Sequence, residues 1–263
     1  MNQPELRTVD VIRYVTPLRE GGSLPAIVEA DDDFFYVLKF RGAGQGKKAL
    51  IAEIIGGELA RMMGLKVPEL VFMNLDDSFS KTEPDEEIQD LLRFSVGLNL
   101  GLHYLEGAIN YDPLVPITDP LSASKVVLLD SLITNVDRTH RNTNLLNWKG
   151  ELWLIDHGAS LYFHHAWQNW EKHAQRSFPA IKDHVLLGEA GQLAEAAAFI
   201  AKNISRQDID NILNIIPDDF LEEEGNPATP VEKRQVYGDF LSQRLSMIDE
   251  LTKEASDARQ AHI

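Results

Sequence analysis

Hydrophobic residues gather in short, strand-like stretches through the first hundred positions of the chain. Stretches rich in β-branched and aromatic residues are typical of β-strands. They lie at Val9 to Val15, Pro25 to Ala30, Phe34 to Phe40 and Val67 to Phe72. Between the last two, apolar residues from Lys48 to Gly64 recur with helical spacing, which predicts a helix that ends at the glycine.

The pattern changes in the middle of the chain. Residues 76–90 are acidic and polar, which favours a mobile loop or a short exposed helix, and Leu92 to Leu105 is apolar again, as in a strand that runs into a connector. Helical spacing then prevails, which predicts a strand-rich part over residues 1–106 and a larger helical part over residues 107–263. The expected helices run from Asp119-Pro120 to Ile133, from Gln192 to Asn203, from Ser205 to Ile216 with a capping box at Ser205 and Asp208, and from Val231 to Asp257.

Composition narrows the class of protein. The 263 residues are 44% hydrophobic and include no cysteine, which suits a sizeable core and excludes disulfides, thiolate catalysis and iron–sulfur clusters. The net charge of −16 argues against nucleic acid as a partner, because affinity for phosphate backbones comes largely from clustered basic residues. No apolar run reaches the roughly 20 residues of a membrane span, and Met1 to Glu5 do not resemble the start of a signal peptide. The sequence therefore predicts a cytoplasmic protein with no membrane partner.

A predicted β-hairpin organises the most informative stretch of the chain. Asn144 to Trp148 and Glu151 to Ile155 look like two short strands joined at Lys149-Gly150. Antiparallel pairing across this turn places Asn142 opposite Asp156 to within about one residue of register. An amide oxygen and a carboxylate are therefore expected to converge at the open end of the hairpin.

These oxygen groups suit phosphoryl transfer. Mg²⁺ prefers hard oxygen ligands and is usually held by one or two carboxylates together with water and phosphate, so Asn142 and Asp156 are candidate ligands. Asp137 lies just outside the hairpin, where its carboxylate can orient an attacking hydroxyl or accept its proton.

A lysine and a glutamate in the first part of the chain complete a kinase-like set. Alternation places Lys39 on the same face of its strand as Phe35 and Val37, where an unpaired ammonium group is costly. Glu53, in the following helix, is the expected partner, and Glu58 of the same helix is the alternative. Lysine, glutamate, Asp-x₄-Asn and Asp-x-Gly thus follow one another in the order that a protein-kinase-like site requires.

At these motifs the sequence resembles the HipA-like kinases, bacterial relatives of eukaryotic protein and phosphatidylinositol kinases. The resemblance covers about residues 9–225 and implies an α+β, two-lobed protein-kinase-like fold with a small strand-rich N-lobe and a larger helical C-lobe. The matching segments are Asn135-x-Asp137-Arg138-x₃-Asn142-x-Asn144-Leu145-Leu146, Ile155-Asp156-His157-Gly158, Lys39, the helix from Lys48 to Gly64, and Ile216-Pro217-Asp218-Asp219-Phe220.

The resemblance also implies roles for individual residues. Asp137 would be the catalytic aspartate, Asn142 and Asp156 the Mg²⁺ ligands, and Lys39 the contact to the α- and β-phosphates of ATP. Gly21-Gly22-Ser23 would form the phosphate-covering loop, and Ser23 is a candidate autophosphorylation site. The adenine is expected near the connector from Leu98 to Glu106, and the implied acceptor is a Ser or Thr hydroxyl on a protein.

Other motifs support weaker interpretations. The glycine-rich segment from Gly42 to Lys48 fails the Walker A pattern and is expected to be a flexible linker. Arg138 and Arg141 are candidate phosphate contacts or members of a solvated face, and Trp167 and Trp170 are expected to pack against the core. The histidines at His140, His157, His164 and His165 lack the spacing of zinc ligands.

Two alternatives to an ATP- and Mg²⁺-dependent protein kinase remain open. One is a kinase of small molecules or lipid headgroups, because Asp-Arg followed by asparagine also resembles phosphatidylinositol kinases. The other is a pseudokinase or interaction module without turnover, which the presence of Lys39, Asp137, Asn142 and Asp156 disfavours. The identity of the acceptor, a toxin–antitoxin role and the oligomeric state are open at this point.

Overall fold

The computed structural model describes residues 5–18 and 24–262, and the chain divides into two compact units. The first unit contains Met1–Ile51 and Pro68–Glu106, and the second contains Ala52–Val67 and Gly107–Ile263. Residues 52–67 thus group with the helical unit, whereas the sequence pattern places all of residues 1–106 in the strand-rich part. The predicted phosphate-covering turn Gly21-Gly22-Ser23 lies outside the described residues.

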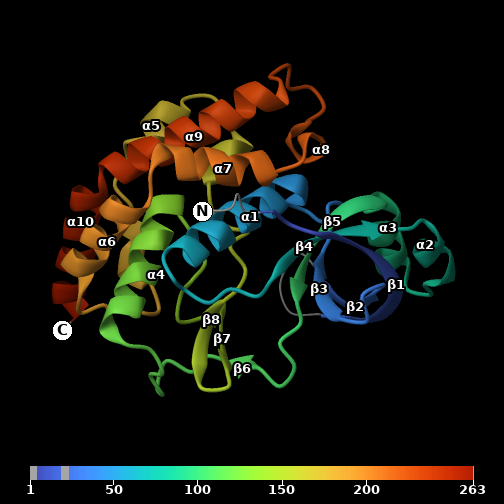
Figure 1. Ribbon diagram of the computed structural model, residues 1–263, viewed down its shortest axis with the longest axis horizontal. Coiled ribbons are helices and arrows are strands. Elements are labelled where there is room, and N and C mark those ends of the chain that lie inside the picture. The colour runs from blue at the N-terminus through green and yellow to red at the C-terminus, as the bar shows by residue number, and fades with distance from the viewer. Residues whose placement is uncertain (1–4, 19–23, 263) are drawn as a thin grey trace. The chain divides into compact units, whose positions relative to one another are not determined.

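The first unit is built on a closed barrel (Figure 1). Its strands are β1 (Thr8–Pro17), β2 (Ala26–Ala30), β3 (Phe35–Lys39), β4 (Leu70–Leu75) and β5 (Gly97–His103). Antiparallel pairing follows the order β1, β2, β3, β5, β4, and a parallel pairing of Thr8 with Phe72 joins β1 to β4 and closes the barrel. The first three strands lie close to their expected bounds, whereas the fourth begins at Leu70 rather than Val67.

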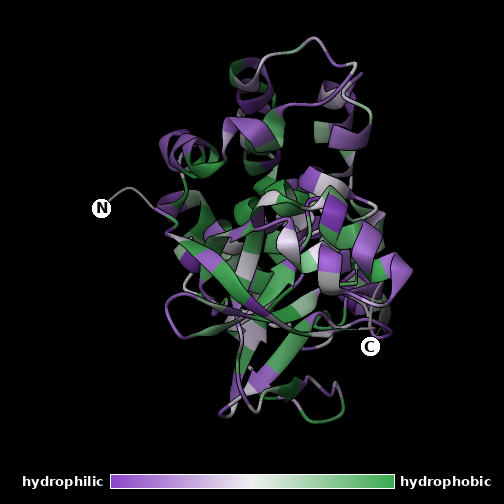
Figure 2. Cartoon of the chain, turned by 90° about the vertical axis from the view of Figure 1, so that its right-hand side faces the viewer, coloured by the Kyte–Doolittle hydropathy of each residue, from purple (hydrophilic) through white to green (hydrophobic). Residues whose placement is uncertain are grey.

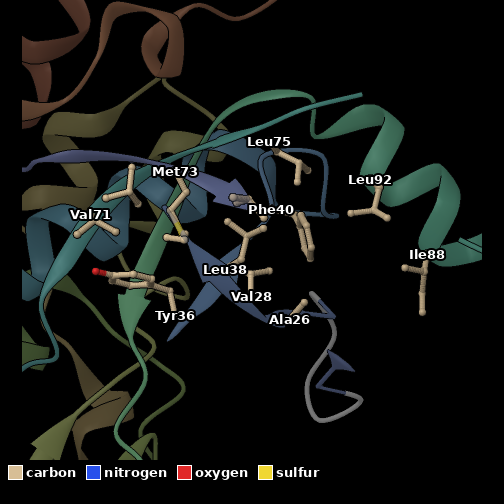
Figure 3. Close-up of a cluster of buried hydrophobic side chains, with 13 residues drawn as sticks. Ala26, Val28, Tyr36, Leu38, Phe40, Val71, Met73, Leu75, Ile88 and Leu92 are labelled. Carbon is tan, nitrogen blue, oxygen red and sulfur yellow. The ribbon is translucent and has the colours of Figure 1, made fainter. Parts of the chain in front are cut away.

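Alternate side chains of these strands point into the barrel and form the core of the first unit (Figure 3). In β3, Tyr36 and Leu38 are buried and Lys39, at the end of the strand, is half-buried. Fully burying an apolar side chain contributes about 1.5–3 kcal/mol, so this cluster is a main source of the unit's stability. Members labelled in Figure 3 are Ala26, Val28, Tyr36, Leu38, Phe40, Val71, Met73, Leu75, Ile88 and Leu92.

The acidic segment after the fourth strand contains two short helices, so of the two expectations for residues 76–90 the short helix is the closer one and the loop is not. It forms α2 (Ser78–Thr82) and α3 (Glu86–Phe94), and α3 takes in the residues from Leu92 that were expected to start a strand. The Asp85 side chain caps α3 by accepting the backbone N–H of Glu87, and Ile88 and Leu92, four residues apart, face the barrel core. Burial of that apolar side stabilises a helix whose other residues are mostly polar.

Helix α1 (Gly46–Met62) follows the barrel's third strand and is confirmed close to its expected position. Its residues from Ala52 onward belong to the second unit, where Ile54, Ile55 and Leu59 are buried. Gly64 follows the helix with a φ of 75°, a left-handed conformation that glycine adopts without steric cost.

The second unit is mainly helical and is centred on α4 (Pro120–Ile133), whose residues from Val126 to Ile133 are all buried. Asp119 caps α4 by accepting the backbone N–H groups of Leu121 and Ser122, as its position before a proline predicts. Helices α6 (Leu193–Asn203) and α10 (Ile248–His262) pack against α4, and α7 (Arg206–Ile215) packs against α9 (Pro230–Ser246). Figure 2 shows hydrophobic and hydrophilic residues side by side along several helices of the chain. Shorter helices are α5 (Trp170–Ala174) and α8 (Asp218–Leu221), with 3₁₀ turns at Tyr162–His165 and Pro179–Asp183.

The long C-terminal helix expected from Val231 to Asp257 is in fact two helices. The break falls at Met247, whose backbone N–H bonds to the carbonyl groups of Arg244 and Leu245 and so closes α9. No proline or glycine marks this position in the sequence. Both helices contact α4, but α10 also contacts α6 while α9 also contacts α5 and α7.

A small sheet in the second unit contains the predicted hairpin. It consists of β6 (Ile109–Asn110), β7 (Leu145–Trp148) and β8 (Glu151–Leu154). The turn residues Lys149 and Gly150 both have positive φ, 55° and 79°, which is the backbone of a tight two-residue hairpin turn. Among the described residues, no helix is long and apolar enough to cross a lipid bilayer.

Candidate active site

The open end of the β7–β8 hairpin brings two distant segments of the second unit together. Leu145 pairs with Leu154, and beyond this pair the backbone N–H of Ile155 donates to the carbonyl of Asn144 at 3.1 Å. Asn142 and Asp156 therefore lie on the two segments that leave this end of the hairpin. The convergence of their side chains stays a prediction from the sequence.

The carboxylate of Asp137 is held by two amide groups. Its Oδ2 accepts hydrogen bonds from Nδ2 of Asn142 at 2.8 Å and from Nδ2 of Asn144 at 3.2 Å. The Asp137 backbone N–H donates to Oδ1 of Asn135 at 3.1 Å, which fixes the start of the loop. The carboxylate is thereby oriented while the residue stays partly exposed, so it can meet a group that enters from solvent. Asn144 belongs to the family motif, but its bond to Asp137 does not follow from the sequence pattern.

The hydrogen bond from Asn142 to Asp137 also leaves the Asn142 side-chain oxygen as a possible cation ligand. An amide that donates through Nδ2 keeps its Oδ1 as an acceptor, and Asn142 is exposed. Asp156, half-buried on the neighbouring segment, has a left-handed backbone with a φ of 55°. Non-glycine residues in this conformation are uncommon and cluster at functional sites. Amide and carboxylate oxygens are the donors that Mg²⁺ takes, so these two residues fit a magnesium ion whose other ligands are water and phosphate.

Glu53 binds the residue that follows Asp156. The Glu53 carboxylate is completely buried, its Oε2 accepts the backbone N–H of His157 at 2.8 Å, and its Oε1 lies 3.3 Å from Nδ1 of the His157 ring. The ring packs directly on α1, because a Cβ added to Gly56 would lie only 2.7 Å from it. The sequence pattern does not predict the contact of Glu53 with His157. Gly56, one helical turn after the glutamate, is the signal that could have indicated a close neighbour.

The predicted lysine and its partner lie in different units. Lys39 ends β3 in the first unit and Glu53 belongs to the second, so their ion pair stays a prediction. The alternative partner, Glu58, accepts a hydrogen bond from Nε of Arg61 at 3.0 Å. Of the predicted site residues, the second unit thus assembles Asp137, Asn142, Asp156 and Glu53 around one hairpin end.

Arg138 is buried, so both interpretations offered for it, a phosphate contact and a member of a solvated face, are wrong. Its side chain is only 1% exposed, and its Nε donates to Oδ2 of Asp130 at 2.6 Å. Arg141, three residues later, is exposed and still available to bind an anion. Trp167 contacts the rings of Phe163 and Tyr237 edge-on, as expected for a residue that packs against the core.

Histidines do not assemble a metal centre in the part of the chain that the structure covers. No group of three or more His, Cys, Asp or Glu side chains there could hold a metal ion. His164 bonds through Nδ1 to the hydroxyl of Tyr237 at 2.9 Å, and His157 packs on α1 as described above. The oxygen donors at the hairpin therefore remain the candidate cation ligands.

Comparisons with known proteins agree with this architecture. A family model described as HipA-like kinase matches residues 11–250. The solved structure of the Helicobacter pylori proinflammatory kinase CtkA is similar, with a TM-score of 0.57, 14% identity, and coverage of 91% of this chain and 95% of that one. The Golgi casein kinase with Mn/ADP bound is similar with a TM-score of 0.52, 10% identity, and coverage of 98% and 75% of the two chains. A search of the curated proteins finds no match.

Proposed function

Because this chain belongs to the HipA-like kinase family, we propose that it transfers the γ-phosphate of ATP to a hydroxyl group with the help of Mg²⁺. The observation that carries this proposal is the partly exposed Asp137 carboxylate held by the amides of Asn142 and Asn144 at the open end of the hairpin. Asp156 lies on the segment that leaves the same end of the hairpin, so an oriented carboxylate and two oxygen donors suited to a divalent ion are proposed to share the work of phosphoryl transfer.

Each residue has a defined task in this reaction. Asp137 accepts the proton of the acceptor hydroxyl as its oxygen bonds to the γ-phosphorus and the bond from that phosphorus to the β-phosphate oxygen breaks, which releases ADP. Asn142 and Asn144 keep the carboxylate aimed at the hydroxyl by donating to its Oδ2. Asn142 Oδ1 and the Asp156 carboxylate would hold the Mg²⁺, which neutralises charge on the phosphates when it is bound.

Residues of the first unit complete the proposal. Lys39 is proposed to contact the α- and β-phosphates, and Gly21-Gly22-Ser23 is proposed to cover them. Adenine is proposed to bind near residues 98–106. The structure of the Golgi casein kinase holds Mn and ADP, and the shared fold supports nucleotide and divalent-ion binding here.

The proposed acceptor is a Ser or Thr hydroxyl on a protein, as family membership suggests. The net charge of −16 makes a divalent cation important, because ATP must bind against the protein's own negative field. A cytoplasmic location stays a prediction from the sequence.

Incubation with labelled ATP and Mg²⁺ tests this function. Purified protein would be mixed with a cell extract, beside Asp137→Asn and Asp156→Asn variants and an Asp257→Asn control on the exposed face of α10. Wild type and control are expected to label a protein band that both active-site variants fail to label. Equal labelling by all four proteins contradicts the kinase proposal, and labelling of lipid or small molecules alone moves the acceptor to another class.

Nucleotide binding provides an independent measurement. Mg²⁺ with ATP is expected to raise the melting temperature of the wild type, because a ligand that binds only the native state stabilises it. If Mg²⁺ and ATP leave the melting temperature unmoved and no labelling is seen, the chain is an interaction module that has the fold without turnover.

A further inference from the structure

Arg138, the residue after Asp137, is buried among groups that lie on both sides of the hairpin. Its Nη1 donates to the backbone carbonyl of Asn144 and, at 3.3 Å, to that of Ile155. Asn144 is two residues from Asn142, and Ile155 immediately precedes Asp156. A single guanidinium group therefore ties together the two backbone segments that present the proposed cation ligands.

The other side of the guanidinium is anchored to α4. Its Nε donates to Oδ2 of Asp130, and the same oxygen receives a bond from Nε2 of His184 at 2.9 Å. Oδ1 of Asp130 accepts Nδ2 of Asn135 at 3.1 Å, two residues before Asp137. Both carboxylate oxygens are thus engaged, and Asp130 has little freedom to move.

His184 has a defined proton position in this cluster. Its Nδ1 accepts the backbone N–H of Leu186 at 3.0 Å, so in the neutral ring the proton is on Nε2 and is donated to Asp130. The backbone next to His184 also contacts the catalytic loop, because the N–H of Val185 donates to the carbonyl of Arg138 at 3.1 Å. His184 therefore supports both the carboxylate and the loop.

Stability alone does not account well for a charged group at this position. Asp130 and Arg138 are fully buried, and burying an ion pair is often no more stabilising than apolar residues of the same size. Arg138 Nη2 is also buried without a hydrogen-bond partner among the described residues, which has a further cost. Arg138 does what an apolar side chain could not do, because its guanidinium holds the carbonyl groups of Asn144 and Ile155 at a set separation.

We propose that Arg138, fixed by Asp130 and His184, is a positioning residue that sets the spacing of Asn142 and Asp156 for a divalent cation. This inference rests on the proposed kinase function. It assigns the arginine to the support of the cation site and not to contact with phosphate. Residues that support metal ligands typically change metal affinity or activity by about 10–100-fold when they are replaced.

Arg138→Lys is the informative variant, because lysine keeps the positive charge but lacks the planar fork that serves Asp130 and two carbonyls together. The measurement is binding of a fluorescent ADP analogue as a function of Mn²⁺ concentration, with the melting temperature recorded in parallel. Arg244→Lys is the matched control, since Arg244 is another buried arginine that donates to backbone carbonyls, including that of Ser131 at 2.5 Å.

The Mn²⁺ concentration for half-maximal nucleotide binding is expected to rise at least about tenfold in Arg138→Lys. In Arg244→Lys only the melting temperature is expected to fall. An Arg138→Lys protein that is less stable but has an unchanged Mn²⁺ requirement overturns the inference. If that variant fails to fold, His184→Gln decides: a raised Mn²⁺ requirement supports the proposal, and an unchanged one rejects it.

Nucleotide binding by the wild type distinguishes a failure of the proposed kinase function from a failure of the positioning role of Arg138. If it does not bind the ADP analogue at any Mn²⁺ concentration, the proposed function fails and the inference fails with it. If it binds and Arg138→Lys binds identically, only the positioning role is lost.

Discussion

The backbone N–H of His157 donates a hydrogen bond to the carboxylate of Glu53, a residue 104 positions earlier in the chain, at 2.8 Å. The contact ties the segment that carries Asp156 to helix α1, and it is buried from solvent. A bond to a buried carboxylate is strong and leaves a costly unpaired group when it is broken. Movement of α1 and movement of the Asp156 segment are therefore coupled.

This contact depends on the absence of a side chain at Gly56. Gly56→Ala would put a Cβ within 2.7 Å of the His157 ring, so the ring or the helix must shift. Overpacking of this kind costs about 1–3 kcal/mol of unfolding free energy, and the shift is expected to lower kinase activity as well. Urea unfolding and labelled-ATP assays measure the two effects. Gly188→Ala is the control, because nothing lies within 4 Å of a Cβ at that position; equal behaviour of the two variants would contradict the prediction.

Asn144 combines a left-handed backbone with a bond to the Asp137 carboxylate, the proposed catalytic group. Its φ is 49°, and its Nδ2 donates to Asp137. Asn144→Gly and Asn144→Ala both remove the amide, so both are expected to lower kcat by about tenfold, a fraction of the 10²–10⁴ that proton transfer contributes. Only the alanine variant must force a Cβ into the left-handed region, which costs about 1–2 kcal/mol. Steady-state kinetics and melting temperatures separate the effects, and a glycine variant with normal kcat would show that the amide does not orient Asp137.

The Asp130 cluster predicts a loss of stability in mild acid. Burial lowers the pKa of His184 despite its hydrogen bond to Asp130, and Arg138 and His140 lower it further. The unfolded chain therefore binds a proton at this histidine, from about pH 6.5 downward, that the folded chain does not bind. Stability due to His184 is complete above that pH and declines as the pH falls towards the lower, folded pKa.

Asp130 acts in the same direction at lower pH. Burial alone would raise the pKa of this carboxyl, but the charge of Arg138 and the bond from His184 outweigh it and hold the pKa well below its usual range. Urea unfolding at pH 7.5, 6.5 and 5.5 is expected to show falling stability, with a smaller fall in His184→Gln. Parallel curves for the two proteins would mean that His184 is not the group that titrates.

Several local features could be predicted because neighbouring residues determine them. Lys149-Gly150 set the turn and thereby the register that pairs Leu145 with Leu154. Asp119 before a proline set the start of α4, and Ser205 with Asp208 forms the expected capping box. In each of these cases the relevant hydrogen bonds join residues within a few positions of one another.

Predictions failed where distant packing decided the outcome. Residues from Leu92, expected to begin a strand, instead end α3, because Ile88 and Leu92 bury against the barrel core. The C-terminal helix is broken at Met247 without a local signal, and its two halves share α4 but otherwise contact different helices. The sequence position of Arg138 beside Asp137 suggested a phosphate contact or a solvated face. In the structure the residue is buried and donates to the Asp130 carboxylate of α4.

The order of the kinase motifs and the hairpin next to Asp137, Asn142 and Asp156 follow from residue types at short spacing in the sequence. The bond of Glu53 to the His157 segment and the buried cluster of Arg138, Asp130 and His184 depend instead on how distant elements pack together. A buried charge must find its partner in space, and that partner can come from any element that packs nearby.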